Sequence, residues 1–328
     1  MEADSKPVPD TFFWVFVFGA IGAVIGVCIL APWPWATPEV SKNTIEAFMN
    51  TKEFDVWRVI VLITASLFLV LPLPAWTSLK KLWEDTSIDP RPDTIRLGIS
   101  AVILLILFAL PFIVEPILAC FDKLEIPRKL SRPLPGHNLR VLILPIIGAL
   151  GTLLPASLGI WLLQAAIEKK DSLNVKDYLR FREQLQQLLL ILGVILGLAV
   201  LVTGAERLAL TALMHPFADL IKGENPLRFN LETAYPAIRV LASGAYLTML
   251  VALIYVPTFA SFRKVGLELV NKLLPPSDKP AKGWETYNKE RKALEELLQV
   301  KVSARKSLET MVPLLLPLLG GLTSTLLG

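Results

Sequence analysis

Two adjacent ionisable residues, Glu206 and Arg207, interrupt a long apolar stretch of this sequence. Ionisable side chains at membrane depth are costly unless they are paired or hydrated, so such residues point to a functional site. On a helix these two side chains would point about 100° apart and could not simply neutralise each other. We predict that they form a polar strip, in a conduction path or gate, with Glu115 and Arg239 from other apolar stretches. The alternative is a set of internal ion pairs, or of side chains that reach to the membrane surface.

A second group of residues, close before the same apolar stretch, combines positive charge with an aromatic ring. Cationic side chains bind phosphate, and aromatic rings stack on bases. The group therefore predicts a binding face for a phosphate-bearing ligand, such as a nucleotide or a nucleic-acid strand. The alternative is that these charges set the topology and contact anionic lipid headgroups. The members are Lys169, Lys170, Lys176, Tyr178, Arg180 and Arg182.

The residue patterns of common enzymes are missing from the sequence. The chain has two histidines, His137 and His215, which lie far apart and outside any metal-binding spacing. Ser243 followed by Gly244 resembles a nucleophile on a membrane helix, but no histidine follows it to act as a base. The sequence also has no glycine-rich phosphate loop of the P-loop type. We therefore predict a protein without enzymatic activity, and we expect no metal and no cofactor.

The composition is that of a membrane protein. Of the 328 residues, 53% are hydrophobic and 19% are charged, which is too apolar for an ordinary soluble domain. Apolar runs of about 20 residues can cross a bilayer as helices. We predict an all-α, polytopic helical bundle over residues 1–262, with the lipid bilayer as its solvent. Its transmembrane helices, about six in number, are predicted at residues 12–31, 57–76, 95–120, 141–167, 187–213 and 234–262.

One long helix, residues 174–213, organises the predicted bundle. At the usual rise of an α-helix it would be about 60 Å long, so it should begin in the cytoplasm with residues 174–186 and end across the bilayer. A loop is expected after it. Residues 263–310 predict a cytoplasmic helical tail that begins with a short amphipathic helix. Residues 311–328 are apolar but too short for an independent span, so we expect a re-entrant hairpin or a segment docked against neighbouring helices.

The distribution of Lys and Arg predicts the orientation. Loops rich in Lys and Arg face the cytoplasm, and most of the predicted loops of this kind share a side with both termini. We therefore predict a multi-pass protein of the bacterial inner membrane with both termini in the cytoplasm. The basic loop at residues 122–140 conflicts with this orientation. Either it is an external basic patch, or one neighbouring run is re-entrant and the number of spans differs by one.

The last quarter of the chain resembles a group of bacterial membrane proteins. The resemblance covers YVPTFASF (residues 255–262), the following RKVGLELVNKLLPP, and SLETMVPLLLPLLGGLTSTLL (residues 307–327). These segments are similar to membrane effectors of anti-phage operons, including the effector of Hailong-type defence. The resemblance implies an oligomeric channel that is held shut until infection and is controlled by a ligand from a partner nucleotidyltransferase. It assigns no individual site residue.

These patterns together favour a gated, oligomeric channel or a membrane-disrupting effector. In this hypothesis the cytoplasmic helices bind a regulator, and the long helix transmits the change to the region of Glu206, Arg207 and Arg239. A small-solute or ion transporter is one alternative, with the proline-broken third and fourth helices as its substrate site, although no inverted repeat relates the two halves of the sequence. A membrane anchor for a cytoplasmic partner is the other.

Overall fold

The protein is helical in the part of the chain that the computed structural model describes. This part contains no β-strand, and five of its helices are long and apolar enough to cross a bilayer. The predicted all-α fold is therefore confirmed. Of the predicted third span only a few residues are described, and these are helical. The described residues are 11–30, 49–85, 99–104, 106–108, 144, 146–169, 173–221, 237–276, 283–300, 312–313 and 315–323.

The five long apolar helices overlap five of the six predicted spans. Three of them contain 33, 35 and 34 residues. Helices of this length are longer than the apolar core of a bilayer requires, so they must tilt or extend beyond it. The five are Phe13–Leu30, Lys52–Glu84, Ile146–Glu168, Val175–Ala209 and Val240–Leu273.

Helix α8 (Val175–Ile221) is the central element of the bundle, where it contacts α3, α4, α7 and α10. The Asn174 side chain caps its N-terminus by accepting a hydrogen bond from the backbone N–H of Asp177 (2.7 Å). The helix then runs for 47 residues without a break, so the predicted continuous rod is confirmed. The loop expected after residue 213 does not begin there, because α8 continues to Ile221, and residues 222–236 lie outside the described part of the chain. A single proline, Pro216, removes only one amide donor and does not end the helix.

Glycines allow α1 (Thr11–Leu30) to pack closely against α3 (Lys52–Val70). A Cβ atom at Gly22 would lie 2.5 Å from the Cα atom of Ser66, so only glycine permits this contact. Such close approach of two backbones is typical of membrane helices that pack through small residues. After a turn, α3 is followed by α4 (Pro72–Asp85), and the two helices together form one of the five long apolar segments.

A π turn, η1 (Ala149–Leu153), precedes α7 (Leu154–Lys169). Pro155 has no N–H to donate to the carbonyl of Gly151, so the regular pattern of hydrogen bonds fails here. The N–H of Leu154 instead donates to the carbonyl of Ala149, five residues back. The prolines and glycines of this region predicted an irregular helix, and the π turn is the irregularity.

Helix α10 (Ala237–Leu273) continues through Pro257. The proline removes one amide donor, but the hydroxyl of Thr258 donates to the carbonyl of Ile254 (3.2 Å) and so supplies a bond within the weakened turn. The prediction of a separate short helix from residue 263 is therefore wrong. That stretch is the last part of α10.

Helix α11 (Trp284–Leu297) folds back along the end of α10, and Arg291 holds the two together. The Arg291 guanidinium donates to the side-chain oxygen of Asn271 (2.7 Å) and to the carbonyl of Leu274 (3.2 Å). It also donates to the hydroxyl of Tyr287 (3.2 Å), and this hydrogen bond is the main cause of the raised pKa of Arg291. The position of α11 is thus fixed by several directional bonds.

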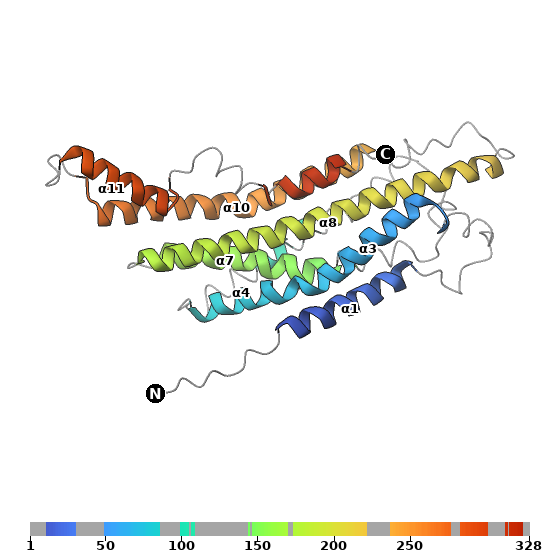
Figure 1. Cartoon of the computed structure of the whole chain (residues 1–328), viewed down its shortest axis with the longest axis horizontal. Coiled ribbons are helices and arrows are strands. Elements are labelled where there is room, and N and C mark those ends of the chain that lie inside the picture. The colour runs from blue at the N-terminus through green and yellow to red at the C-terminus, as the bar shows by residue number, and fades with distance from the viewer. Residues whose placement is uncertain are drawn as a thin grey trace.

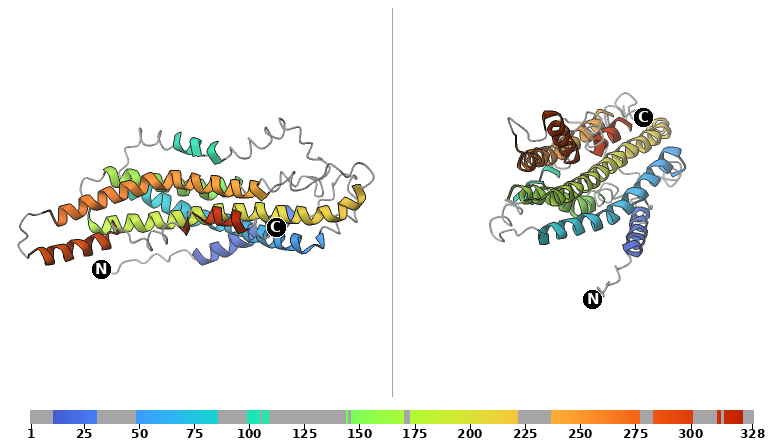
Figure 2. Two further views of the ribbon diagram at one scale, coloured as in Figure 1. Left: turned by 90° about the horizontal axis from the view of Figure 1, so that it is seen from above. Right: turned by 60° about the vertical axis from the view of Figure 1, so that its left-hand side comes forward.

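The bundle is elongated and has two different ends (Figure 1). The end of α4, the start of α8, the end of α10 and the whole of α11 lie at one end, which we call the tail end. The start of α3, the end of α8 and the start of α10 lie at the opposite end, and Figure 2 shows the same arrangement from two other directions. Exposed cations on the parts of α4, α8 and α10 nearest the tail end are Lys80, Lys81, Lys176, Arg180, Arg263, Lys264 and Lys272.

Candidate functional site

The last turn of α11 closes at a glutamine in a backbone conformation that favours glycine. Gln299 has a φ of +49°, where a side chain costs about 1 kcal/mol. The N–H of Gln299 donates to the carbonyl of Glu296 (3.0 Å), and that of Val300 donates to the carbonyl of Glu295 (2.9 Å). These two bonds are the Schellman motif that ends many helices. The glutamine at this unfavourable position suggests that its side chain makes a compensating contact.

That contact is with Arg182 on the central helix α8. The Arg182 guanidinium donates to the carbonyl of Leu298 (2.7 Å) and to the side-chain oxygen of Gln299. A cation in this position also interacts favourably with the negative end of the α11 dipole. Arg182 is only 9% exposed, and a buried charge requires such partners. Arg182 therefore fastens the last turn of α11 to α8.

Tyr178, one helical turn before Arg182, brings α10 into the same junction. Its hydroxyl lies 3.2 Å from the carbonyl oxygen of Phe262 and 3.4 Å from that of Leu298, and it donates its hydrogen towards these two acceptors. We call Tyr178, Arg182, Phe262, Leu298 and Gln299 the latch. The latch joins α8, α10 and the end of α11 at one point.

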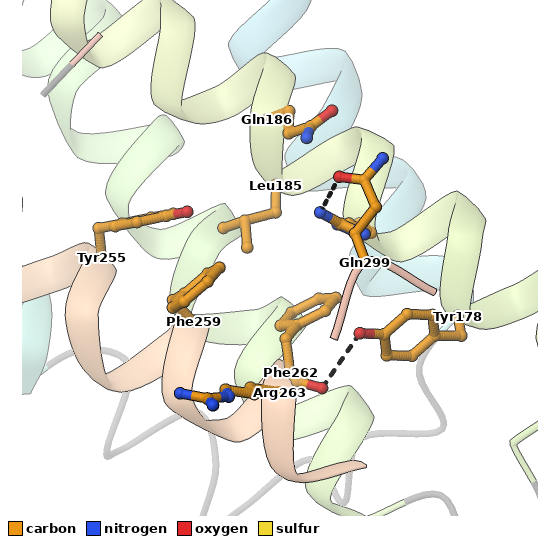
Figure 3. A pocket seen from close by; sticks show the side chains of 9 residues that line it. Tyr178, Leu185, Gln186, Tyr255, Phe259, Phe262, Arg263 and Gln299 are labelled. Atoms are coloured by element: carbon orange, nitrogen blue, oxygen red, sulfur yellow. Dashed lines mark hydrogen bonds between the residues drawn. The ribbon is translucent and has the colours of Figure 1, made fainter. Parts of the chain in front are cut away.

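A small hollow borders the latch (Figure 3). Leu185 from α8 and the rings of Tyr255 and Phe259 from α10 form much of its wall. The two rings stack with their centroids 5.5 Å apart. This aromatic wall keeps α8 and α10 packed against each other beside the latch.

Polar contacts also hold the face of α10 that is turned towards α7. The hydroxyl of Ser261 donates to the carboxylate of Glu168 (2.6 Å), and that of Thr258 lies 3.2 Å from the side-chain oxygen of Gln164. The Gln164 amide in turn donates to Glu168 (3.1 Å). The part of α10 around Pro257 is therefore held by polar bonds to both α7 and α8.

Residues 312–313 and 315–323, which we call the C-terminal segment, dock between α8 and α10 (Figure 1, dark red). A Cβ atom at Gly193 of α8 would lie 2.2 Å from the carbonyl oxygen of Pro313. One at Gly244 of α10 would lie 2.6 Å from the carbonyl oxygen of Pro317. Both distances are far below a normal contact, so a side chain at either glycine would displace the segment. Docking was one of the two arrangements that the sequence suggested for this region.

The structure places two of the four predicted gate residues fully. Glu206 and Arg207 lie on α8, and each has an interaction partner. Arg207 is 6% exposed, and Glu206 is partly exposed. Arg239 belongs to α10, but its side chain lies outside the described part of the chain, as does the whole of Glu115. A polar strip formed by all four stays a prediction.

The residues predicted to bind a ligand fall into two groups. Lys176 and Arg180 are exposed at the tail end, whereas Tyr178 is 2% exposed and Arg182 is buried in the latch. In the present arrangement Tyr178 cannot stack on a base, and the Arg182 donors are engaged by the end of α11. Two further members lie outside the described part of the chain: the side chain of Lys169 and the whole of Lys170.

Sequence reasoning missed Gln299 and the glycines that receive the C-terminal segment. The glycines left a signal, because Gly193 and Gly197 are four residues apart and so share one face of α8. Pro313 and Pro317 have the same spacing in the segment that faces them. Gln299 left no comparable signal, because its partner on α8 is 117 residues away in the chain.

The two roles of Gln299 can be separated by substitution. Gln299→Gly removes the side-chain bond to Arg182 but relieves the strained backbone, whereas Gln299→Ala removes the same bond and keeps the strain. We expect the glycine variant to be more stable than the alanine variant by about 1 kcal/mol. Thermal unfolding of the two purified variants in the same detergent measures this difference. Equal stability would show that the backbone at this position is unstrained.

These features define a class of protein: a helical bundle with five helices long and apolar enough to cross a bilayer, whose tail is fastened to the central helix. Comparisons with protein-family models, with curated proteins and with solved structures found no match. The function therefore has to be inferred from the latch, from α8 and from the docked segment.

Proposed function

We propose that the protein is a gated, oligomeric membrane channel or membrane-disrupting effector that is controlled from its tail end. The observation that supports this proposal best is the continuity of α8, which runs as one helix from Arg182 in the latch to Glu206 and Arg207. About 36 Å of helix separates Arg182 from Glu206 at 1.5 Å per residue. A rigid helix of this length transmits a displacement at the latch to the ionisable pair.

The orientation in this proposal follows from charge. Among the described residues, the exposed cations of α4, α8 and α10 lie towards the tail end and outnumber those of α3, Lys52 and Arg58, at the opposite end. Positively charged helix ends usually face the cytoplasm. We therefore place the tail end on the cytoplasmic side of a bacterial inner membrane. The docked segment ends beside Val240, away from the tail end, so a cytoplasmic position of both termini stays a prediction. The exposed apolar side chains of α1 and α3, such as Phe16, Val24 and Val59, would then face lipid.

The regulator in this proposal is a phosphate-bearing ligand, such as a nucleotide or a nucleic-acid strand. Lys176 and Arg180 offer exposed cations on the same helix as the latch. When the latch opens, the Arg182 guanidinium and the Tyr178 ring become available to the same ligand. Ligand binding and latch opening would therefore favour each other, as expected when a ligand prefers one of two conformations.

Recordings of unitary currents test the channel. In planar bilayers the purified protein should give single-channel currents, and Glu206→Ala should abolish them or change their amplitude, because it removes a charge at membrane depth. Glu183→Ala is the matched control, since Glu183 is an exposed glutamate on the same helix. Saturable, gradient-coupled uptake without unitary currents would instead indicate a transporter. Neither activity, together with co-purification of a second protein, would indicate an anchor.

The gene neighbourhood tests the biological setting separately. The resemblance of the last quarter of the chain to anti-phage membrane effectors implies a partner nucleotidyltransferase. A nucleotidyltransferase gene next to this one would support a role in defence. A neighbouring uptake or biosynthetic operon would contradict it.

A further inference from the structure

We infer that the C-terminal segment is a built-in closing element of the protein. While the latch is shut, the segment lies in the groove between α8 and α10 and holds the two helices in their present positions. When the latch opens, the segment leaves the groove. The inference depends on the proposed channel function only for the effect on permeability, and the docking itself can be tested without that function.

The fit between the segment and its groove is made by backbone on both sides. Besides the contacts of Gly193 and Gly244, a Cβ atom at Gly320 of the segment would lie 3.1 Å from the carbonyl oxygen of Gly197. One at Gly321 would lie 3.2 Å from the carbonyl oxygen of Val240 on α10. Glycines of the segment therefore face backbone of both helices, and glycines of both helices face the segment. Such mutual fit specifies one register between the three elements.

The chemistry of the contact between the C-terminal segment and the two helices suits a segment that has to leave the groove. Pro317 has no N–H to donate to the carbonyl of Pro313, the normal acceptor one turn earlier. That carbonyl oxygen lies against Gly193, where a glycine Cα–H can act as a weak donor. Single contacts of this kind are weak. These glycine contacts therefore position the segment mainly by its shape.

The latch and the segment are placed so that one controls the other. Both bind α8, through Arg182 and Gly193 respectively, and these two positions are about 16 Å apart along the helix. Residues 301–311 connect the latch covalently to the segment. The latch thus anchors the connection at one end, and its opening removes this anchor, so that the segment is then held by its own contacts with α8 and α10.

A disulfide tests the docking directly. An ideal Cβ atom at Gly197 lies 3.3 Å from the Cβ atom of Leu316, close to the separation of about 3.5–4.5 Å found in disulfides. We would introduce Gly197→Cys and Leu316→Cys into the full chain after replacing its own Cys28 and Cys120 by serine. Mild oxidation should cross-link this pair efficiently. Gly197→Cys with Leu319→Cys is the matched control, because Leu319 is 47% exposed on the same segment and should not cross-link.

Arg182→Ala in the cross-linking background tests the coupling to the latch. The rate of disulfide formation should fall by at least about tenfold, because the substitution removes two hydrogen bonds from a charged donor. In liposomes the oxidised Gly197→Cys/Leu316→Cys protein should pass no ions with or without Arg182→Ala, and reduction should produce a flux only in the variant that carries Arg182→Ala. Failure of the pair to cross-link would overturn the docked segment, and an unchanged rate with Arg182→Ala would overturn its control by the latch. Efficient, latch-dependent cross-linking without flux in any state would refute the channel and leave the docking established.

Discussion

Gly193→Leu should make the protein permanently permeable. The carbonyl oxygen of Pro313 would lie 2.2 Å from the first atom of any side chain at this position, and both contacting groups belong to helix backbones that cannot rotate away. The C-terminal segment must therefore leave the groove. Ion flux into liposomes that contain the variant should exceed that of the parent by about tenfold or more, since displacing a backbone contact of this kind costs well over 1.4 kcal/mol.

Gly19→Leu is the matched control for this experiment. The nearest atom to a Cβ at Gly19 is a methyl carbon of Val70 at 3.9 Å, an ordinary contact. This variant should therefore behave like the parent. If Gly193→Leu reaches the membrane in normal amounts and its flux equals that of the parent, the segment does not close the protein.

Arg182→Ala should release the end of α11 from the central helix. It removes the hydrogen bonds to the carbonyl of Leu298 and to the side chain of Gln299. Hydrogen bonds from charged donors contribute about 1.5–3 kcal/mol each, and the cost of burying the charge offsets part of this sum. We expect a net loss of about 2–4 kcal/mol. Amide hydrogen exchange in α11 should become faster, and thermal unfolding in detergent should begin at a lower temperature.

Two variants separate the latch from a general effect of charge. Lys176→Ala removes another exposed cation of the same helix and should change stability by less than about 0.5 kcal/mol. Arg182→Lys keeps the charge but lacks the planar group that reaches two acceptors at once, so it should lie between the parent and Arg182→Ala. Unchanged hydrogen exchange in α11 after Arg182→Ala would mean that Arg182 does not hold α11 in place.

The helical architecture was predictable because it depends on local composition. Long apolar runs indicated most of the spans, and the continuous pattern around residues 174–213 indicated α8. The boundaries were less predictable. The sequence predicted a loop after residue 213 and a separate helix from residue 263, yet Pro216 and Pro257 both lie within continuous helices. One missing donor costs less than the unpaired backbone groups of a helix end in an apolar environment.

The latch could be predicted only in part. Tyr178 and Arg182 were singled out for their chemistry, but the sequence suggested an external ligand as their partner, whereas the structure pairs them with backbone carbonyls of Phe262 and Leu298. A backbone carbonyl is present at every residue and gives no sequence signal. The Gln299 contact depends on a positive φ, and a glutamine in the sequence does not indicate that its φ is positive. Long-range contacts of this kind can be identified only when the three-dimensional fold is known.

The position of the C-terminal segment along the chain has a consequence for biosynthesis. The ribosome synthesises α8 and α10 before residues 312–323. The groove between α8 and α10 is therefore vacant for the seconds that synthesis of the intervening residues requires. A cell that makes this protein must tolerate, shield or shorten that interval, and slow translation of the codons between α10 and the segment would prolong the exposure of a bundle without its own closing element.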